Sequence, residues 1–164
     1  MTRGTGIQAF QPGDLERLDR LLHAFLHDTG ARCAILMDRT GRLLTSAGDT
    51  AGFDGITFAS LAAADFAASD QLAMLLGEEE FSTLYHQGDD RSMYLADVGG
   101  HAILAALFGG RTTLGMVRLK AKAVAPHFAA LFAEVAARQV PQRREGVVDW
   151  AAAAADEIDR LFAD

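Results

Sequence analysis

The chain has 164 residues, of which 50% are hydrophobic and 23% are charged, a composition typical of a folded domain rather than a disordered segment. Its net charge of −7 argues against nucleic acid or an anionic membrane as the main partner, because binding to phosphates needs clustered cations. A single cysteine, Cys33, excludes an internal disulfide framework, and no apolar run suits a signal peptide or a membrane span. These features predict a cytoplasmic protein.

The first predicted element is a helix that ends at Thr29-Gly30. Asp14 follows Pro12-Gly13 and is the expected N-cap, and Gly30 suits the left-handed conformation at a helix end. Large apolar side chains recur at three- and four-residue spacing and predict one buried stripe: Leu15, Leu18, Leu22, Phe25 and Leu26.

A β-hairpin is expected next. Residues 33–37 (CAILM) form a continuously apolar run, and residues 42–47 return after a turn at 38–41. The turn contains Asp and Gly, which tolerate the positive φ angles of short hairpin loops.

A second helix is predicted over residues 57–76, closed by Gly77. Its bulky residues gather near one face, whereas small and polar residues occupy the other face. The alanine-rich face has two interpretations. It is either buried against another layer, or it meets its own copy across a two-fold axis and presents a flat groove to a third chain. The pattern alone leaves both open.

Three strands and a third helix complete the main pattern. The strands are expected at 81–87, 92–97 and 101–108, with hairpin turns between them, and the helix begins near Thr113 and is kinked at Pro126. The order α-β-β-α-β-β-β-α predicts an α+β fold, in which a five-stranded antiparallel sheet carries helices on both faces.

The end of the chain is expected to be separate from the domain. We expect a domain over residues 1–138, a polar linker over 139–148, and an amphipathic helix over 149–164. Three apolar residues in the acidic final segment are candidate anchors for a partner: Ile158, Leu161 and Phe162. Docking is favoured over a frayed terminus, because such anchors have the spacing of a helix that binds a groove.

No pattern predicts catalysis or metal binding. His23 and His27 have the four-residue spacing of zinc ligands, but the HExxH arrangement is absent. A nucleophilic pair of Cys33 and His86 has no local support. The Gly109–Thr113 turn lacks the lysine of a phosphate-binding loop, so a capped helix start is the favoured interpretation. We therefore expect no cofactor, no metal and no catalytic residue.

Four stretches together resemble roadblock/dynein-light-chain domains, and within them the bacterial MglB-type regulators. They are the LLGEEEF helix end, the YHQGDD turn, the SMYLADVGGHAILAALF strands and the RTTLGMVRLKAKA helix start. The likeness covers about residues 15–135 and extends to the linker and the final acidic helix.

The resemblance implies a roadblock-type α/β/α sandwich that forms a homodimer. Two copies would bind one Ras-like GTPase of the MglA type and speed GTP hydrolysis by remodelling its switch loops without an arginine finger, in cell polarity and gliding motility. The regulator would act in the cytoplasm or at a cell pole. It would be no enzyme itself.

By position, the resemblance implies a platform on the second helix, and it assigns the final-helix anchors a second contact with the GTPase. The platform residues are Ala63, Ala64, Ala67, Ala68 and Gln71. Asp65 and Phe66 stand where an amide and a small residue are common in the family, so the shape of the groove is expected to differ.

Two other classes stay open. One is a non-catalytic scaffold that binds a GTPase without stimulating hydrolysis. The other is a small-molecule sensor, which needs a deep polar pocket. The apolar residues expected inside the sheet favour a filled core instead: Ala34, Leu36, Ile103 and Ala105.

Overall fold

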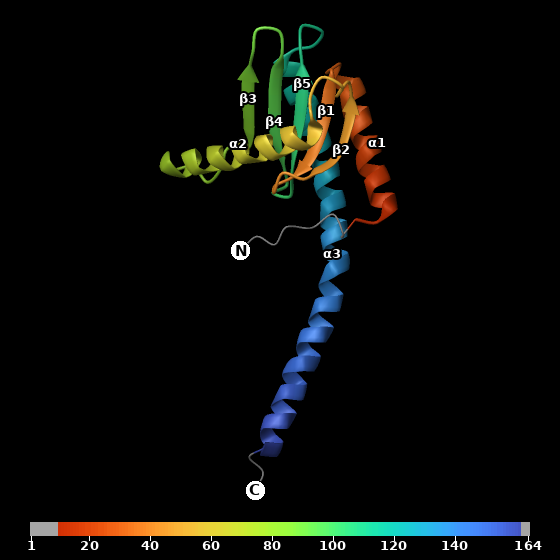
Figure 1. The fold of residues 1–164 in the computed structure, drawn as a ribbon, viewed down its shortest axis with the longest axis vertical. Coiled ribbons are helices and arrows are strands. Elements are labelled where there is room, and N and C mark those ends of the chain that lie inside the picture. Colours follow the sequence, from red (N-terminus) through yellow and green to blue (C-terminus); the bar gives the residue numbers. More distant parts are fainter. Residues whose placement is uncertain (1–9, 162–164) are drawn as a thin grey trace.

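The computed structural model describes residues 10–161, with side chains up to residue 138. The described residues form three helices and five strands in the predicted order, and Figure 1 shows how these elements are arranged. The elements are α1 (Pro12–Thr29), β1 (Cys33–Asp38), β2 (Leu43–Gly48), α2 (Gly55–Leu75), β3 (Thr83–Gln87), β4 (Ser92–Val98), β5 (Ala102–Phe108) and α3 (Leu114–Leu161). The predicted α+β fold is confirmed, and the strands begin and end close to the expected residues.

The five strands form one antiparallel sheet in the order β2-β1-β5-β4-β3. The two N-terminal strands and the three later strands are each joined by hairpins, and β1 then pairs with β5. Consequently β3 and β2 are the edge strands. The antiparallel arrangement follows from the short turns, which leave no room for a parallel crossover.

Helices cover both faces of the sheet. Helices α1 and α3 share one core, which includes Leu22, Phe128 and Val135, with the side chains that alternate along β4 and β5. Helix α2 covers the other face, where Phe66 packs with Ile35 and Ile103. Successive residues of a strand point to opposite faces, so the apolar strands β1 and β5 supply both cores.

The start of α1 differs from the expectation. Its N-cap is Gln11 rather than Asp14, which lies one turn further on and accepts a hydrogen bond from the Gln11 backbone N–H at 2.9 Å. Proline lacks a backbone N–H and has a φ angle suited to the first helical turn, so the helix begins at Pro12. The expected end is confirmed, because Gly30 has a φ of 68°.

Helix α3 runs without interruption over 48 residues. Residues 139–148, expected to form a polar linker, continue the helix, and the helix also continues across Pro126. A nucleated helix adds residues at lower cost than a new one forms, and the alanines and arginines before Gly146 are strong helix formers. Figure 1 shows the second half of α3 leaving the domain. Whether the two halves act as separate units stays a prediction.

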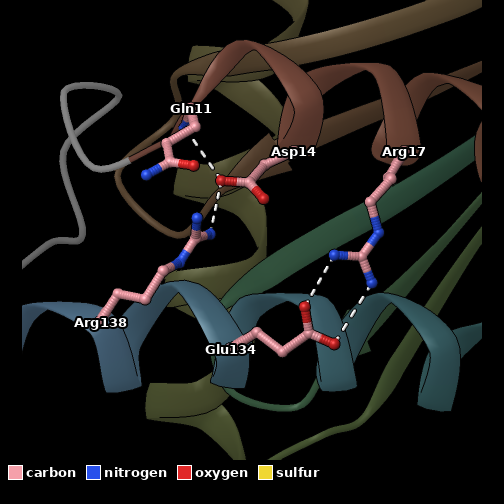
Figure 2. A network of polar contacts seen from close by, with 5 residues as sticks. All are labelled: Gln11, Asp14, Arg17, Glu134 and Arg138. Carbon is pink, nitrogen blue, oxygen red and sulfur yellow. Dashed lines mark hydrogen bonds and ion pairs between the residues drawn. The ribbon is translucent and has the colours of Figure 1, made fainter.

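Two ion pairs hold α1 against α3 (Figure 2). Arg138 donates to the buried carboxylate of Asp14 at 2.6 Å, and Arg17 makes two hydrogen bonds to Glu134, at 2.7 and 3.2 Å. Both lie near the N-terminus of α1, where α3 leaves the domain. They therefore fix the direction in which α3 departs from the sheet.

In the described part of the chain, none of the helices is both long and apolar enough to cross a membrane.

Candidate functional site

Helix α2 turns four alanines and Phe66 toward the sheet and its leucines outward. The sheet-facing side chains are Ala59, Ala62, Ala63, Phe66 and Ala73. Leu61, Leu72 and Leu75 are exposed. The alanines let α2 lie close to the strands, while the described residues of the chain leave the outer apolar surface uncovered. Such a surface marks a site of protein contact.

Four of the five expected platform residues lie on the exposed side of α2. Ala64, Ala67, Ala68 and Gln71 are exposed, but Ala63 is only 5% exposed and belongs to the core beneath the helix. Ala63 lies four residues after Ala59, so the two occupy the same inward face. Ala63 is therefore removed from the candidate site.

The outermost row of α2 follows three- and four-residue spacing and is called the α2 ridge. It consists of Leu61, Ala64, Ala68, Leu72 and Leu75. The expected platform did not include the three leucines. Their common face was visible in the sequence, but nothing in the sequence showed that it points outward.

Arg39 holds α2 to the turn between β1 and β2 and to β4. Its guanidinium donates to Asp70 of α2 at 3.0 Å and to Asp97 at 2.8 Å, and it lies 5.2 Å from the centre of the Phe66 ring. Phe66 is buried against the sheet, so its side chain is not itself part of the outer surface. Gly41 lets the same turn approach the backbone of α2 closely. A Cβ at this position would lie 2.9 Å from the Ser60 Cα, which is too short for a side chain to fit.

The other flank of α2 contacts the edge strand β3. A hydrogen bond of 2.8 Å joins Nε2 of His86 to the carboxylate of Asp65. Figure 1 shows the C-terminal part of α2 extending past β3. The C-terminal end of α2, with the exposed Leu72 and Leu75, and the edge strand β3, which pairs on one side only, therefore lie at the same edge of the sheet.

The surroundings of the ridge are acidic. Helix α2 contains two aspartates and no lysine or arginine, and the exposed Glu78–Glu80 run follows it. An apolar ridge with acidic neighbours suits an apolar partner surface edged by cations.

The residues considered for catalysis do not come together. Burial raises the pKa of the Cys33 thiol to about 11, so the thiolate is scarce at neutral pH. Cys33 and His86 lie on β1 and β3, which are separated by β5 and β4, or roughly 14 Å at the usual strand spacing. In the described residues there is no group of three side chains able to hold a metal, and His23 bonds the backbone carbonyl of Asp19.

The Gly109–Thr113 segment caps a helix. The Thr113 hydroxyl accepts a hydrogen bond from the Met116 N–H at 3.2 Å, as the cap interpretation predicted. An open hollow of about 600 Å³ lies beside the segment, and Arg32 and Arg111 line it together with Asp49 and Asp90. The strand residues expected to fill the core do so: Ala34, Leu36, Ile103 and Ala105 are buried.

The expected tail anchors are placed only in part. Ile158 and Leu161 belong to the helical backbone of α3, but their side chains and the whole of Phe162 lie outside the described residues.

Comparison with known proteins identifies the family. A model of the Roadblock/LC7 domain matches residues 17–108. MglB of Myxococcus xanthus is 32% identical with a TM-score of 0.73, and the match covers 77% of this chain and 95% of that one. The gliding protein MglB of Thermus thermophilus is 32% identical with a TM-score of 0.72, covering 81% and 99%.

A further similar structure is an MglB in a tetrameric arrangement, 32% identical with a TM-score of 0.73, and the match covers 82% of this chain and 99% of that one. A search of curated proteins gave no match. The family model spans more than half of the chain, and the sheet order, helix layers and resemblance from sequence agree with it. This chain belongs to the Roadblock/LC7 family.

Proposed function

We propose that this chain is a GTPase-activating regulator of a bacterial Ras-like small GTPase of the MglA type. The similarity to two MglB proteins supports the class of partner. The observation that carries the proposal is the exposed α2 ridge, an apolar row that includes Leu61, Leu72 and Leu75. Such a surface acts by binding.

The regulator would bind as a homodimer, with two copies to one GTPase. The α2 ridge has small residues at its centre, so two copies of α2 can approach closely across a two-fold axis. Edge strand β3 has unpaired backbone groups along one side, which a second copy would satisfy. Self-association also agrees with the tetrameric arrangement of a similar MglB.

The mechanism would be a shift in the GTPase's own conformations. A small GTPase is slow because its water-positioning and charge-stabilising groups are not preorganised. A platform that binds best to the catalytically arranged switch loops increases the population of that arrangement. This requires neither an arginine finger nor a reactive residue from the regulator.

The cellular role would be in polarity and gliding motility, with the protein in the cytoplasm or at a cell pole. The Thermus relative, described as a gliding protein, supports the link to motility. The final segment, with Ile158, Leu161 and Phe162, would make a second contact with the GTPase.

The test is GTP turnover by a cognate Ras-like GTPase with and without this protein. We expect acceleration by the wild type, and loss of both binding and acceleration in Ala67→Arg, because a long cation beside the ridge holds the surfaces apart. Ala24→Arg is the matched control: Ala24 is also an exposed helical alanine, but it lies on α1 at the opposite face.

Each outcome separates the candidate functions. Unchanged binding by Ala67→Arg would place the partner surface elsewhere. Binding of the wild type without faster turnover would make the protein a scaffold. Circular dichroism and light scattering of both variants check that the fold and the oligomeric state are retained.

A further inference from the structure

Helix α3 has two apolar faces, and only one of them packs on the sheet. Its buried face includes Val117, Phe128 and Val135. A second row at alternating three- and four-residue spacing is exposed throughout: Met116, Leu119, Ala123, Pro126, Ala130, Ala133 and Ala137. Leu119 is 61% exposed, although the neighbouring Val117 and Ala121 of the same helix are buried against the sheet. We call this row the α3 seam.

The seam continues at the same spacing to the end of α3. The next positions are Val140, Arg144, Val147, Ala151, Ala154, Ile158 and Leu161. Only Arg144 interrupts an otherwise apolar series, and the backbone is helical throughout. A three–four alternation sustained over this length is the heptad pattern by which helices pair in coiled coils. The seam therefore indicates a helical partner along the whole of α3.

The charges along α3 also indicate a partner. Residues 114–126 carry only cations, here called the cationic end: Arg118, Lys120 and Lys122. Residues 149–161 are mainly acidic, and the acidic end is defined as Asp156, Glu157 and Asp159. This order is the reverse of the one that stabilises a single helix, whose N-terminus favours anions and whose C-terminus favours cations. A second helix of opposite direction would compensate both ends.

A second copy of α3, turned antiparallel, matches both features. With residue 116 of one copy level with residue 161 of the other, the seam pairs with itself. Leu119 is then level with Ile158, and Ala123 with Ala154. In the same register Arg118 is level with Asp159, and Lys120 with Glu157. A parallel pair would instead place like charges side by side, which is unfavourable.

We propose that α3 pairs antiparallel with α3 of a second copy of this chain. Residues 119 and 158 of one uninterrupted helix are roughly 60 Å apart, so the acidic end cannot reach its own cationic end. The projecting half of α3 lies clear of the domain in Figure 1 and is accessible to a second copy. The pair covers Ile158 and Leu161, so it would compete with the tail contact that the proposed function assigns to the GTPase.

The direct test is disulfide cross-linking of the full chain. Two variants, Ala123→Cys and Ala154→Cys, each add one small cysteine to the α3 seam and leave the net charge of the chain unchanged. Mixed and oxidised, they should form a disulfide with each other, while each variant alone should form little. The native Cys33 is buried with a raised pKa and stays unreacted. Ala24→Cys, exposed on α1, is the control for random collision.

Charge reversal then tests the pairing chemistry. In the cross-linking background, one variant reverses the cationic end (Arg118→Glu, Lys120→Glu, Lys122→Glu), and another reverses the acidic end (Asp156→Lys, Glu157→Lys, Asp159→Lys). Pairing either variant with an unreversed copy should reduce the mixed disulfide several-fold. Mixing the two reversed variants should restore it, because opposite charges again face each other.

Three results would overturn the proposal. They are the absence of a mixed disulfide above the Ala24→Cys control, self-cross-linking of Ala123→Cys, and cross-linking insensitive to charge reversal. Binding of the cationic end to phosphatidylserine vesicles in place of cross-linking would assign it to a lipid surface. None of these readouts involves a GTPase, so they are independent of the proposed activity.

Discussion

The sharpest prediction concerns Leu75 at the end of the α2 ridge. In the single chain its side chain is 82% exposed, so Leu75→Ala leaves the folded monomer almost unaffected. If α2 and β3 form the dimer contact, nearly all of this side chain becomes buried on association. The dimer should therefore weaken although the monomer stays folded.

The magnitude follows from the apolar area involved. Leucine to alanine removes three carbon atoms, and each buried methylene contributes about 0.8 kcal/mol, giving about 2 kcal/mol per copy. A two-fold contact buries the side chain of each copy, so the loss is about 4 kcal/mol per dimer when burial is complete, and about half of that when it is partial. Since 1.4 kcal/mol is a factor of ten, the dissociation constant should rise by roughly 30- to 700-fold.

Sedimentation equilibrium over a dilution series measures this change. Ile56→Ala is the matched control: Ile56 is 68% exposed, loses as many carbon atoms, and lies at the other end of α2 from β3. We expect its dissociation constant to stay near the wild-type value. A monomeric wild type at micromolar concentration, or equal dissociation constants for both variants, would refute the assigned dimer surface.

Three further predictions concern the mechanism, the α1–α3 contact and the tail. Alanine at Arg91 or Arg111 should leave most of the GTPase stimulation intact; a loss of about 10³ in turnover would reveal an arginine finger. Burial alone raises the pKa of Asp14, but the hydrogen bond from Gln11 and the Arg138 guanidinium outweigh it, and the pKa is lowered below its ordinary value of 3.8. Arg138→Ala should therefore cost about 1–2 kcal/mol in urea unfolding above that pH. The difference should vanish as pH falls through the lowered pKa, and a constant difference would contradict this account. Removing residues 149–164 should change GTPase affinity or nucleotide exchange more than maximal hydrolysis, while equal values for both forms would leave the tail without a role.

Much of the fold was predictable because its signals are local. The α1 stripe follows the helical period, Gly30 ends that helix, and the turn at residues 38–41 has the composition of a short hairpin. Short turns force antiparallel neighbours, so the sequence also indicated the class of sheet. The position of the α1 cap was not predicted, because the preference of Pro12 for the first helical turn outweighed that of Asp14 for the cap.

Local signals were insufficient at residues 139–148. A proline and a glycine in a polar stretch are typical of a linker, but the helix passes through them. The same continuity places the candidate anchors Ile158 and Leu161 on one long helix with Leu119. The heptad row becomes evident only when the whole of α3 is treated as one element.

The sequence by itself determined the order of the elements, the composition of the core strands and the absence of a recognisable catalytic motif. Only the tertiary structure decided which side of α2 faces outward. Both sides of that helix are apolar, so hydrophobic periodicity cannot orient it. Its rotation depends on contacts from distant parts of the chain: Arg39 with Asp70, Gly41 against Ser60, and His86 with Asp65. These contacts place Ala63 inside and leave Leu61 and Leu75 outside, and beside Gly41 the approach is so close that a Cβ at residue 41 would lie 3.4 Å from the Ala63 Cβ.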